Sequence, residues 1–194
     1  PTEESIMWAE DGSQNQTAFE TLDTAIGWIH DAGLKTVVDL HIVNSHHFNA
    51  VNDGGENTLF TSEESQQHLL DLWTQLSAHL QKWDNDFLAY EILNEAVADD
   101  HDDWNKLVAK GIASIREGEP RRPIVVGSNM WQGAQTFPYL RVPENDPNLI
   151  LSFHFYSPFY FTHYRASWVG EYSEYDGPVS YPGKLFPVET LDSL

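Results

Sequence analysis

Hydrophobic and polar positions along the chain follow two periods, one typical of amphipathic helices and one typical of buried strands. Apolar residues recur three or four positions apart in three segments, which predicts helices over residues 17–32, 61–80 and 102–117. Thr61 and Glu64 form a capping-box pair at the start of the second of these helices. Short apolar runs between the helices predict four strands, at residues 35–41, 87–93, 123–128 and 149–156.

Polar side chains gather at the ends of the predicted strands. The four ends carry, in order, Asp39 and His41, Asn94 and Glu95, Ser128 and Asn129, and His154 and Tyr156. Strands that alternate with helices predict a parallel sheet, and in a TIM barrel function gathers at the carboxyl ends of the strands. A complete (β/α)8 barrel takes about 250 residues, whereas the chain has 194. We therefore expect an α/β fold with a single domain over residues 1–194, a partial (β/α) TIM-type barrel of about four parallel strands.

The charge balance narrows the classes of partner. Lys and Arg number 10 and Asp and Glu 30, so the formal net charge is −20. This excess argues against binding to DNA, RNA or anionic membranes, because phosphate groups need cationic surfaces. The chain has no Cys, which excludes disulfides, thiol catalysis and Cys-based zinc sites. No apolar stretch approaches the ~20 residues that span a bilayer, so we expect a soluble protein that acts on an uncharged or cationic substrate.

Three stretches of the sequence resemble family 5 of the glycoside hydrolases, the cellulase-like retaining glycosidases of clan A. They are residues 37–41 (Val-Val-Asp-Leu-His), 90–95 (Tyr-Glu-Ile-Leu-Asn-Glu) and 154–168, which begins His-Phe-Tyr-Ser-Pro-Phe. A lone Asn-Glu pair is a weak signal, but the three motifs in this order are a strong one. The resemblance runs collinearly from about residue 8 to residue 183. It matches the predicted strands to strands three to six of the family's barrel.

The resemblance implies a role for each matched residue. Glu95 corresponds to the general acid/base, which protonates the glycosidic oxygen and later activates water. Asn94 would hold the 2-hydroxyl of the sugar, and His41 lies among the residues that order the same subsite. His154 and Tyr156 would position the nucleophile and the bound sugar. A general acid of this kind needs a pKa raised toward neutrality, which desolvation and a like-charged neighbour can supply at the rim of an apolar barrel.

The second catalytic group of the family has no match in this sequence. Retaining hydrolysis needs a second carboxylate about 5–5.5 Å from the first, which acts as nucleophile. The resemblance places that Glu at the end of the seventh strand, so we expect it to be missing from a chain that ends at Leu194. Three interpretations are open: a fragment of a longer enzyme, a half-barrel whose two copies pair, or a remnant that binds glycans without cutting them. A half-barrel would leave apolar edges at 35–41 and 149–156, and we expect a homodimer that covers both and completes eight strands.

A cluster of histidines raises the question of a metal. His41, His46 and His47 lie close together in the sequence, with Asp39 nearby. No second carboxylate cluster at ligand spacing accompanies them. We therefore expect no metal, favour contact of His46 or His47 with sugar hydroxyls, and include His47 among the substrate-binding residues. Asp39 is expected to have a structural role, bonding backbone or a histidine near the top of the barrel.

The tryptophans divide into two groups. Trp131 and Trp168 follow predicted strand ends, where an indole face can stack on a pyranose ring, so both are candidate substrate-binding residues. Trp73 and Trp104 lie on predicted helix faces and are expected in the core.

The function implied by the resemblance is endo-hydrolysis of a β-linked glucan or a related polysaccharide, with Glu95 as general acid/base. The alternative is a catalytically incomplete half-barrel that binds glycans or serves as a scaffold and can dimerise. No cofactor is implied, because glycoside hydrolysis needs only two carboxylates and water. Family members are mostly secreted, so the resemblance implies a secreted or periplasmic protein whose partner is a β-glucan or a related oligosaccharide.

Overall fold

The computed structural model describes residues 2–48 and 57–182. These residues form two compact units, and each is described by itself. The first comprises residues 2–48 and 57–153, and the second comprises residues 154–182. The expectation of one domain over residues 1–194 stays a prediction.

The first unit is built on a sheet of five parallel strands in the order β1-β2-β3-β4-β5. The strands are β1 (Thr2–Glu3), β2 (Thr36–Ile42), β3 (Leu88–Glu91), β4 (Ile124–Gly127) and β5 (Leu149–Ser152). Each strand is the sheet neighbour of the next strand in the sequence, which is the arrangement of a (β/α) barrel. The predicted α/β class and partial TIM-type barrel are confirmed.

The sheet differs from the prediction at both edges. β1 is a fifth strand, and its two residues are too few to show a hydrophobic period in the sequence. It pairs with the carboxyl-terminal half of β2, so the expectation that residues 35–41 form an open edge is wrong for that half. β5 ends at Ser152 and not at Tyr156. The expected dimer of eight strands assumed four strands in each chain, whereas two five-stranded sheets would hold ten. An eight-stranded dimer therefore no longer follows from the number of strands. Dimerisation itself stays a prediction.

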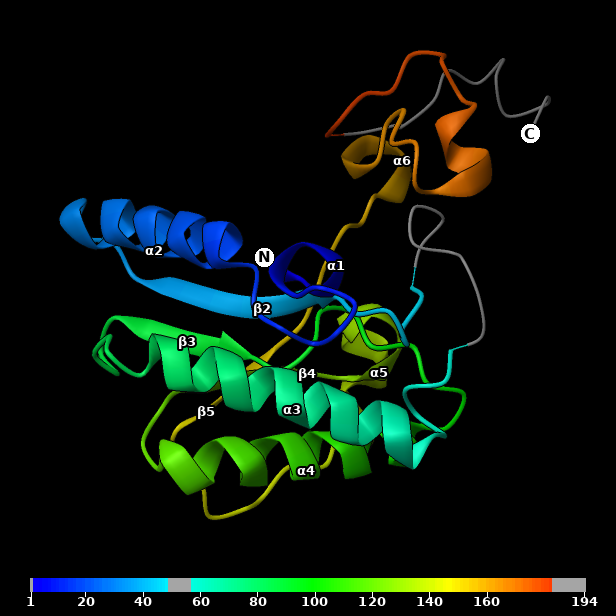
Figure 1. Ribbon diagram of the computed structural model, residues 1–194. Coiled ribbons are helices and arrows are strands. Elements are labelled where there is room, and N and C mark those ends of the chain that lie inside the picture. Colours follow the sequence, from blue (N-terminus) through cyan, green and yellow to red (C-terminus); the bar gives the residue numbers. More distant parts are fainter. Residues whose placement is uncertain (1, 49–56, 183–194) are drawn as a thin grey trace. The chain divides into compact units, whose positions relative to one another are not determined.

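Helices precede or connect the strands of the first unit. They are α1 (Glu4–Met7), α2 (Gln16–Asp31), α3 (Glu63–Leu80) and α4 (His101–Gly118). After β4 the chain forms the short helix α5 (Asn129–Gln132) and a 3-10 helix (Ala134–Tyr139). Figure 1 shows α3 and α4 side by side against the sheet, where they pack on each other. The second unit contains the short helix α6 (Phe159–Thr162) and a 3-10 helix (Gly170–Ser173).

Helix α3 begins after Ser62. The Ser62 side chain accepts a hydrogen bond from the backbone N–H of Ser65 over 3.3 Å, which satisfies one of the free donors of the first turn. The predicted capping box of Thr61 and Glu64 is therefore wrong by one residue. Glu64 instead lies within the first turn, where a negative charge is favourable beside the helix N-terminus.

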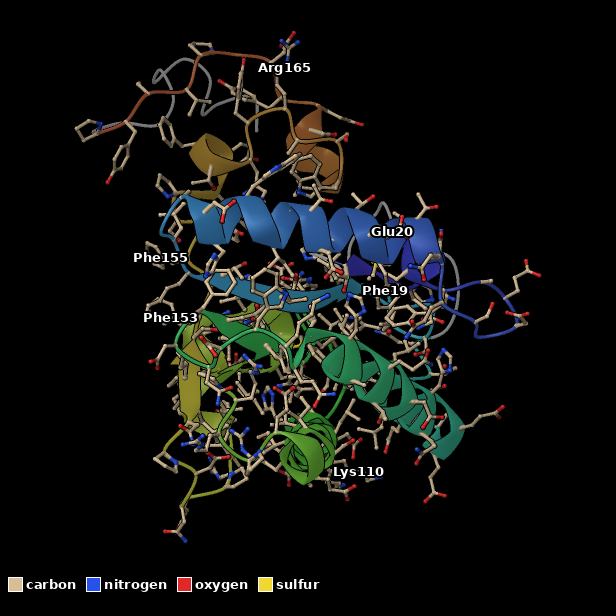
Figure 2. The ribbon with its side chains drawn as sticks, turned by 60° about the vertical axis from the view of Figure 1, so that its left-hand side comes forward. Phe19, Glu20, Lys110, Phe153, Phe155 and Arg165 are labelled. Carbon is tan, nitrogen blue, oxygen red and sulfur yellow. The ribbon has the colours of Figure 1, made fainter. Side chains whose placement is uncertain are left out.

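Side chains alternate between the two faces of the sheet. One face packs against the helices and supplies the core residues Val38, Leu40, Tyr90, Ile92, Ile124 and Val126. Phe19 points from α2 toward this layer, whereas its neighbour Glu20 lies on the outer surface (Figure 2). Trp73 and Trp104 are buried in the same core, as predicted.

The opposite face of the sheet is called the inner face here, because it corresponds to the interior of a barrel. By the same alternation it carries Val37, Asp39 and His41 of β2, Glu91 of β3, Gly127 of β4, and Ile150 and Ser152 of β5. Val37 and Ile150 are about half exposed, at 46% and 49%. The inner face is thus open at β2 and β5, whereas Ala89 and Val125 between them are buried.

Candidate active site

The Asn94-Glu95 pair follows β3, where the chain turns away from the sheet. The backbone N–H of Asn94 donates to the carbonyl of Leu40 on β2 over 3.1 Å, so the turn begins as an extension of the sheet. Asn94 is buried and Glu95 is partly exposed. Glu95 also has a backbone φ of 48°, in the left-handed region that residues other than glycine rarely adopt. Residues held in this way cluster at functional sites.

The segment after β4 holds this turn by side-chain amides. The backbone N–H of Glu95 donates to Oε1 of Gln132 over 3.0 Å. Asn129 binds the backbone of Ala98 twice, since its Oδ1 accepts from the N–H and its Nδ2 donates to the carbonyl, both over 2.8 Å. The turn that carries Glu95 is therefore fixed at both ends by one neighbouring segment.

Trp131 lies in that segment, one residue before Gln132. Its backbone N–H donates to the carbonyl of Ala96 over 3.2 Å, and its indole Nε1 donates to the carbonyl of Phe48 over 2.7 Å. The side chain is nevertheless 47% exposed. One edge of the indole is thus held while about half of its surface is open beside the Glu95 turn. Stacking on a sugar stays a prediction.

Asp39 and His41 form a pair on the inner face of β2. Nδ1 of His41 lies 2.8 Å from Oδ2 of Asp39, and the His41 ring packs edge-on against Phe48. Burial raises the pKa of the Asp39 carboxyl, whereas its hydrogen bond with His41 acts in the opposite direction, and the pKa lies below its usual value. Asp39 therefore bonds a histidine near the carboxyl end of the strand, which is the structural role expected for it.

His46 and His47 have different surroundings. His46 is fully buried between the rings of Phe48 and Phe60, at centroid distances of 5.3 and 5.5 Å. Burial lowers the pKa of His46 to about 3, with repulsion from His47 adding to the effect, so the ring is neutral. His47 is partly exposed, and its backbone N–H and carbonyl both bond the side chain of Asn57. Of the two histidines, only His47 remains a candidate for contact with a sugar.

The amides Asn57, Asn129 and Gln132 organise this region, and of the three only Asn129 carried a signal in the sequence, as a polar residue at a predicted strand end. Asn57 joins two turns, because its Nδ2 also donates to the carbonyl of Val97 over 3.3 Å. All three amides lie in segments without a hydrophobic period, where an Asn or Gln is usually solvated. Their roles depend on partners that are remote in sequence and become visible only in the folded chain.

Two kinds of feature are absent from the described parts of the chain. Within residues 2–48 and 57–182, no three His, Asp or Glu side chains are grouped closely enough to hold a metal ion. No helix in these ranges is long and apolar enough to cross a membrane.

His154, Tyr156 and Trp168 belong to the second unit. The rings of His154 and Tyr156 meet edge to face at 6.0 Å, and Tyr156 packs against His163 at 4.7 Å. The hydroxyl of Thr162 donates to the carbonyl of Tyr156 over 2.6 Å. Trp168 is 47% exposed. His154 and Tyr156 are thus part of one aromatic cluster, and their contacts with a substrate stay predictions.

The chain matches one protein family over most of its length. The family model described as Cellulase (glycosyl hydrolase family 5) matches residues 2–180. Endoglucanase C of Acetivibrio thermocellus is 29% identical over 191 residues, which is 97% of this chain and 54% of the relative. The chain therefore spans about half the length of the curated relatives it matches.

Solved structures show the same relationship. Cel5A of Thermotoga maritima in complex with mannotriose superposes with a TM-score of 0.71 at 27% identity, over 88% of this chain and 51% of that one. The same protein in complex with cellobiose gives a TM-score of 0.73 at 26% identity, over 92% of this chain and 55% of that one. Both likenesses extend over most of this chain and about half of the solved one.

Proposed function

The chain belongs to glycosyl hydrolase family 5, the cellulase family, and from this membership we propose that it provides the acid/base side of a β-glucan cleft. The proposed reaction is endo-hydrolysis of a β-linked glucan. Glu95 is the general acid/base: its carboxyl protonates the glycosidic oxygen as the bond to the leaving sugar breaks. In the complete two-carboxylate site, the nucleophilic carboxylate would bond to the anomeric carbon as the leaving sugar departs, and Glu95 would then take a proton from the water that displaces that carboxylate.

One observation carries this proposal. Glu95 lies just past the carboxyl end of a parallel strand, which is where barrel enzymes place their catalytic groups. Its side chain is partly exposed while its backbone is held in a left-handed conformation by the segment after β4. A solvated surface carboxylate needs no such restraint, whereas a general acid must be aimed at one oxygen.

The proposed sugar contacts involve the candidate residues named in the sequence. Asn94 is proposed to hold the 2-hydroxyl, and Trp131 to stack its exposed indole on a pyranose ring. His41 and His47 are proposed to bond hydroxyl groups. For the second unit, taken by itself, sugar contacts of His154, Tyr156 and Trp168 are proposed separately.

The relatives support this substrate class. The Thermotoga maritima relative is solved with mannotriose and with cellobiose, and both are short saccharides. We propose a secreted or periplasmic location for this chain, since a polysaccharide is too large to enter a cell. No cofactor is part of the proposal, because two carboxylates and water suffice for the reaction.

A second candidate function is glycan binding without hydrolysis. Retaining hydrolysis requires a nucleophilic carboxylate as well as an acid/base. The family resemblance assigns the acid/base to Glu95 but assigns the nucleophile to no residue of this sequence. The same cleft would then hold an oligosaccharide and leave its bonds intact.

The two functions are separated by one comparison. We would assay three proteins on a panel of β-glucans: the 194-residue chain, Glu95→Gln and the control Glu117→Gln. The control changes an exposed carboxylate on α4. Binding of cellotetraose to each is measured by titration calorimetry. Hydrolysis that is lost in Glu95→Gln and kept in Glu117→Gln supports the enzyme. Binding without hydrolysis supports the second function, and neither binding nor hydrolysis contradicts both.

A further inference from the structure

Gln132 is a buried amide at the centre of the candidate site. Its side chain is 1% exposed and makes three hydrogen bonds. Oε1 accepts from the backbone N–H of Glu95 over 3.0 Å, and Nε2 donates to Oε1 of Glu91 over 2.8 Å and to the hydroxyl of Ser152 over 3.1 Å. Gln132, in the segment that follows β4, thus joins β3, β5 and the turn that carries Glu95.

The partners determine how the amide is oriented. The backbone N–H of Glu95 can only donate, so it needs the oxygen of Gln132, whereas an ionised Glu91 carboxylate can only accept and needs the nitrogen. Both ends of the amide are therefore used, and rotating the group by half a turn would leave both contacts unfavourable. A single orientation of Gln132 fits this environment.

The side chain of Gln132 occupies the space next to Gly127, where the sheet has no side chain of its own. A Cβ placed on Gly127, the last residue of β4, would overlap the amide and the Cγ of Gln132. Gly127 and Ser152 are register partners on the inner face, so Gln132 lies over the last pair of this part of the sheet. The missing side chain at Gly127 is what allows the amide to reach Glu91 and Ser152.

The backbone on both sides of the Gln132–Glu95 hydrogen bond is strained. Met130, Trp131 and Gln132 have φ values of 58°, 57° and 54°, and Glu95 has 48°. Left-handed residues of this kind persist only when their surroundings hold them. The hydrogen bond from Glu95 to Gln132 connects two such segments directly.

We propose that Gln132 is a positioning residue that sets the direction of the Glu95 carboxylate. This inference rests on the proposed function, because it assigns Gln132 to the acid/base that the function requires. Gln132 acts through the backbone of Glu95: by holding its N–H, it keeps the residue left-handed and so fixes the direction in which the side chain leaves the backbone. A buried residue with a purely space-filling role would need neither the amide oxygen nor the amide nitrogen.

Two variants remove this restraint by different routes. Gln132→Met keeps a side chain of similar length but has neither amide atom. Gly127→Ala leaves Gln132 unchanged and crowds its amide out of position. The control is Asn105→Leu, which removes another buried amide, one that bonds the backbone of Tyr139 and Arg141 and does not touch the Glu95 turn.

The first measurement is made on the Glu95 amide by NMR. In both test variants we expect its proton to exchange with solvent about ten-fold faster, as follows from the loss of a hydrogen bond. We also expect its coupling to the α proton, which reports φ, to move toward the value of extended backbone. Asn105→Leu should change neither. A Glu95 amide that is unchanged in Gln132→Met and Gly127→Ala overturns the proposal, whether or not the chain acts on glycans.

The second measurement tests whether the hydrogen bond between Gln132 and Glu95 affects glycan binding or hydrolysis. Cellotetraose affinity, and hydrolysis if the chain cuts, are measured for Gln132→Met, Glu95→Gln and the double variant. If Gln132 acts through Glu95, each single change weakens the measured property and the double change adds little to Glu95→Gln alone. Additive losses would show that Gln132 acts independently of Glu95 and contradict the proposal. If the wild-type chain neither binds nor cuts glycans, the proposed function fails and the NMR result alone decides whether Gln132 positions Glu95.

Discussion

Asp39 and His41 are two residues apart on one strand and form a hydrogen-bonded pair on its inner face, with Oδ2 and Nδ1 separated by 2.8 Å. The carboxylate determines which ring nitrogen carries the proton, because an ionised Asp39 can only accept. Nε2 of His41 is then the nitrogen left to accept from a ligand. The His41 side chain as a whole is 37% exposed.

The pair makes a pH-dependent contribution to stability. The pKa of Asp39 lies below its ordinary value of 3.8, so its stabilising contribution is present above about pH 4 and is lost as the pH falls through the folded-state pKa. We expect Asp39→Asn to lower the free energy of unfolding by about 1–3 kcal/mol at pH 7. The difference from wild type should shrink at pH 3. Urea unfolding at both pH values measures it, and an equal difference at both would contradict the pairing.

His46 is expected to destabilise the fold in mild acid. Its pKa is lowered to about 3, while an unfolded histidine has the ordinary value of 6.5. The stabilisation by neutral His46 is complete above pH 6.5. Below that pH the unfolded chain binds a proton that the folded chain does not, and stability falls by about 1.4 kcal/mol per pH unit.

The test compares two slopes. In His46→Phe, the ring is replaced by one that does not titrate and that suits the neighbouring Phe48 and Phe60. We expect wild type to lose about 2 kcal/mol more than this variant between pH 7 and pH 5. Thermal and urea unfolding at the two pH values measure the difference. Parallel pH profiles would show that His46 is protonated in the folded chain.

Glu119 and Arg122 form a buried ion pair, and we expect the loss of one partner alone to be strongly destabilising. Their charged atoms approach to 2.6 Å, and Glu119 also accepts from the hydroxyls of Tyr90 (2.6 Å) and Ser77 (2.8 Å). Arg122 further donates to the carbonyl of Leu88 over 2.8 Å. Arg122→Met should cost about 3–5 kcal/mol, because it leaves a buried carboxylate without its cation.

The double variant Arg122→Met with Glu119→Leu provides the control. Removing both charges leaves no buried ion unpaired, and such replacements are often close to neutral. We therefore expect the double variant to recover most of the stability lost in Arg122→Met. A double variant less stable than the single one, measured by urea unfolding, would mean that the pair stabilises the fold by more than charge compensation.

Trp131 is expected to contribute to glycan affinity. An aromatic stacking contact provides about 0.5–1.5 kcal/mol, so Trp131→Ala should weaken cellotetraose binding by about 3- to 10-fold. The matched control is Trp28→Ala, which removes an exposed indole from α2 that is 72% accessible. Equal losses of affinity in the two variants, measured by calorimetry, would argue against a specific platform at Trp131.

Self-association through β5 is the last prediction. β5 lies at one end of the strand order, and its residues Ile150 and Leu151 are 49% and 47% exposed. Phe153, which follows the strand, projects outward and is 57% exposed (Figure 2). An apolar edge strand tends to pair with another chain. We expect light scattering to show a dimer that Leu151→Lys converts to a monomer, and a monodisperse wild-type monomer would contradict this.

The positions of the long helices and of β2 to β4 could be predicted because each has a repeating buried face. Core residues such as Leu69, Leu72 and Leu76 recur at the helical period, and the alternation of Val38 and Leu40 marks a strand. β1 could not be predicted, because two residues show no period. The position of Glu95 after a strand was predictable from a local motif, Asn-Glu after an apolar run.

The sequence by itself thus determined the α/β class, the order of the elements, the family and the candidate acid/base, since all of these depend on local patterns. Only the tertiary structure decided how the acid/base is held, that His46 is buried and neutral, and that a fifth strand begins the sheet. Glu95 and Gln132 are 37 residues apart, and Glu91 and Gln132 are 41 apart. A hydrogen bond between residues so distant in sequence leaves no periodic trace, because it depends on where the folded backbone brings two otherwise unremarkable positions together.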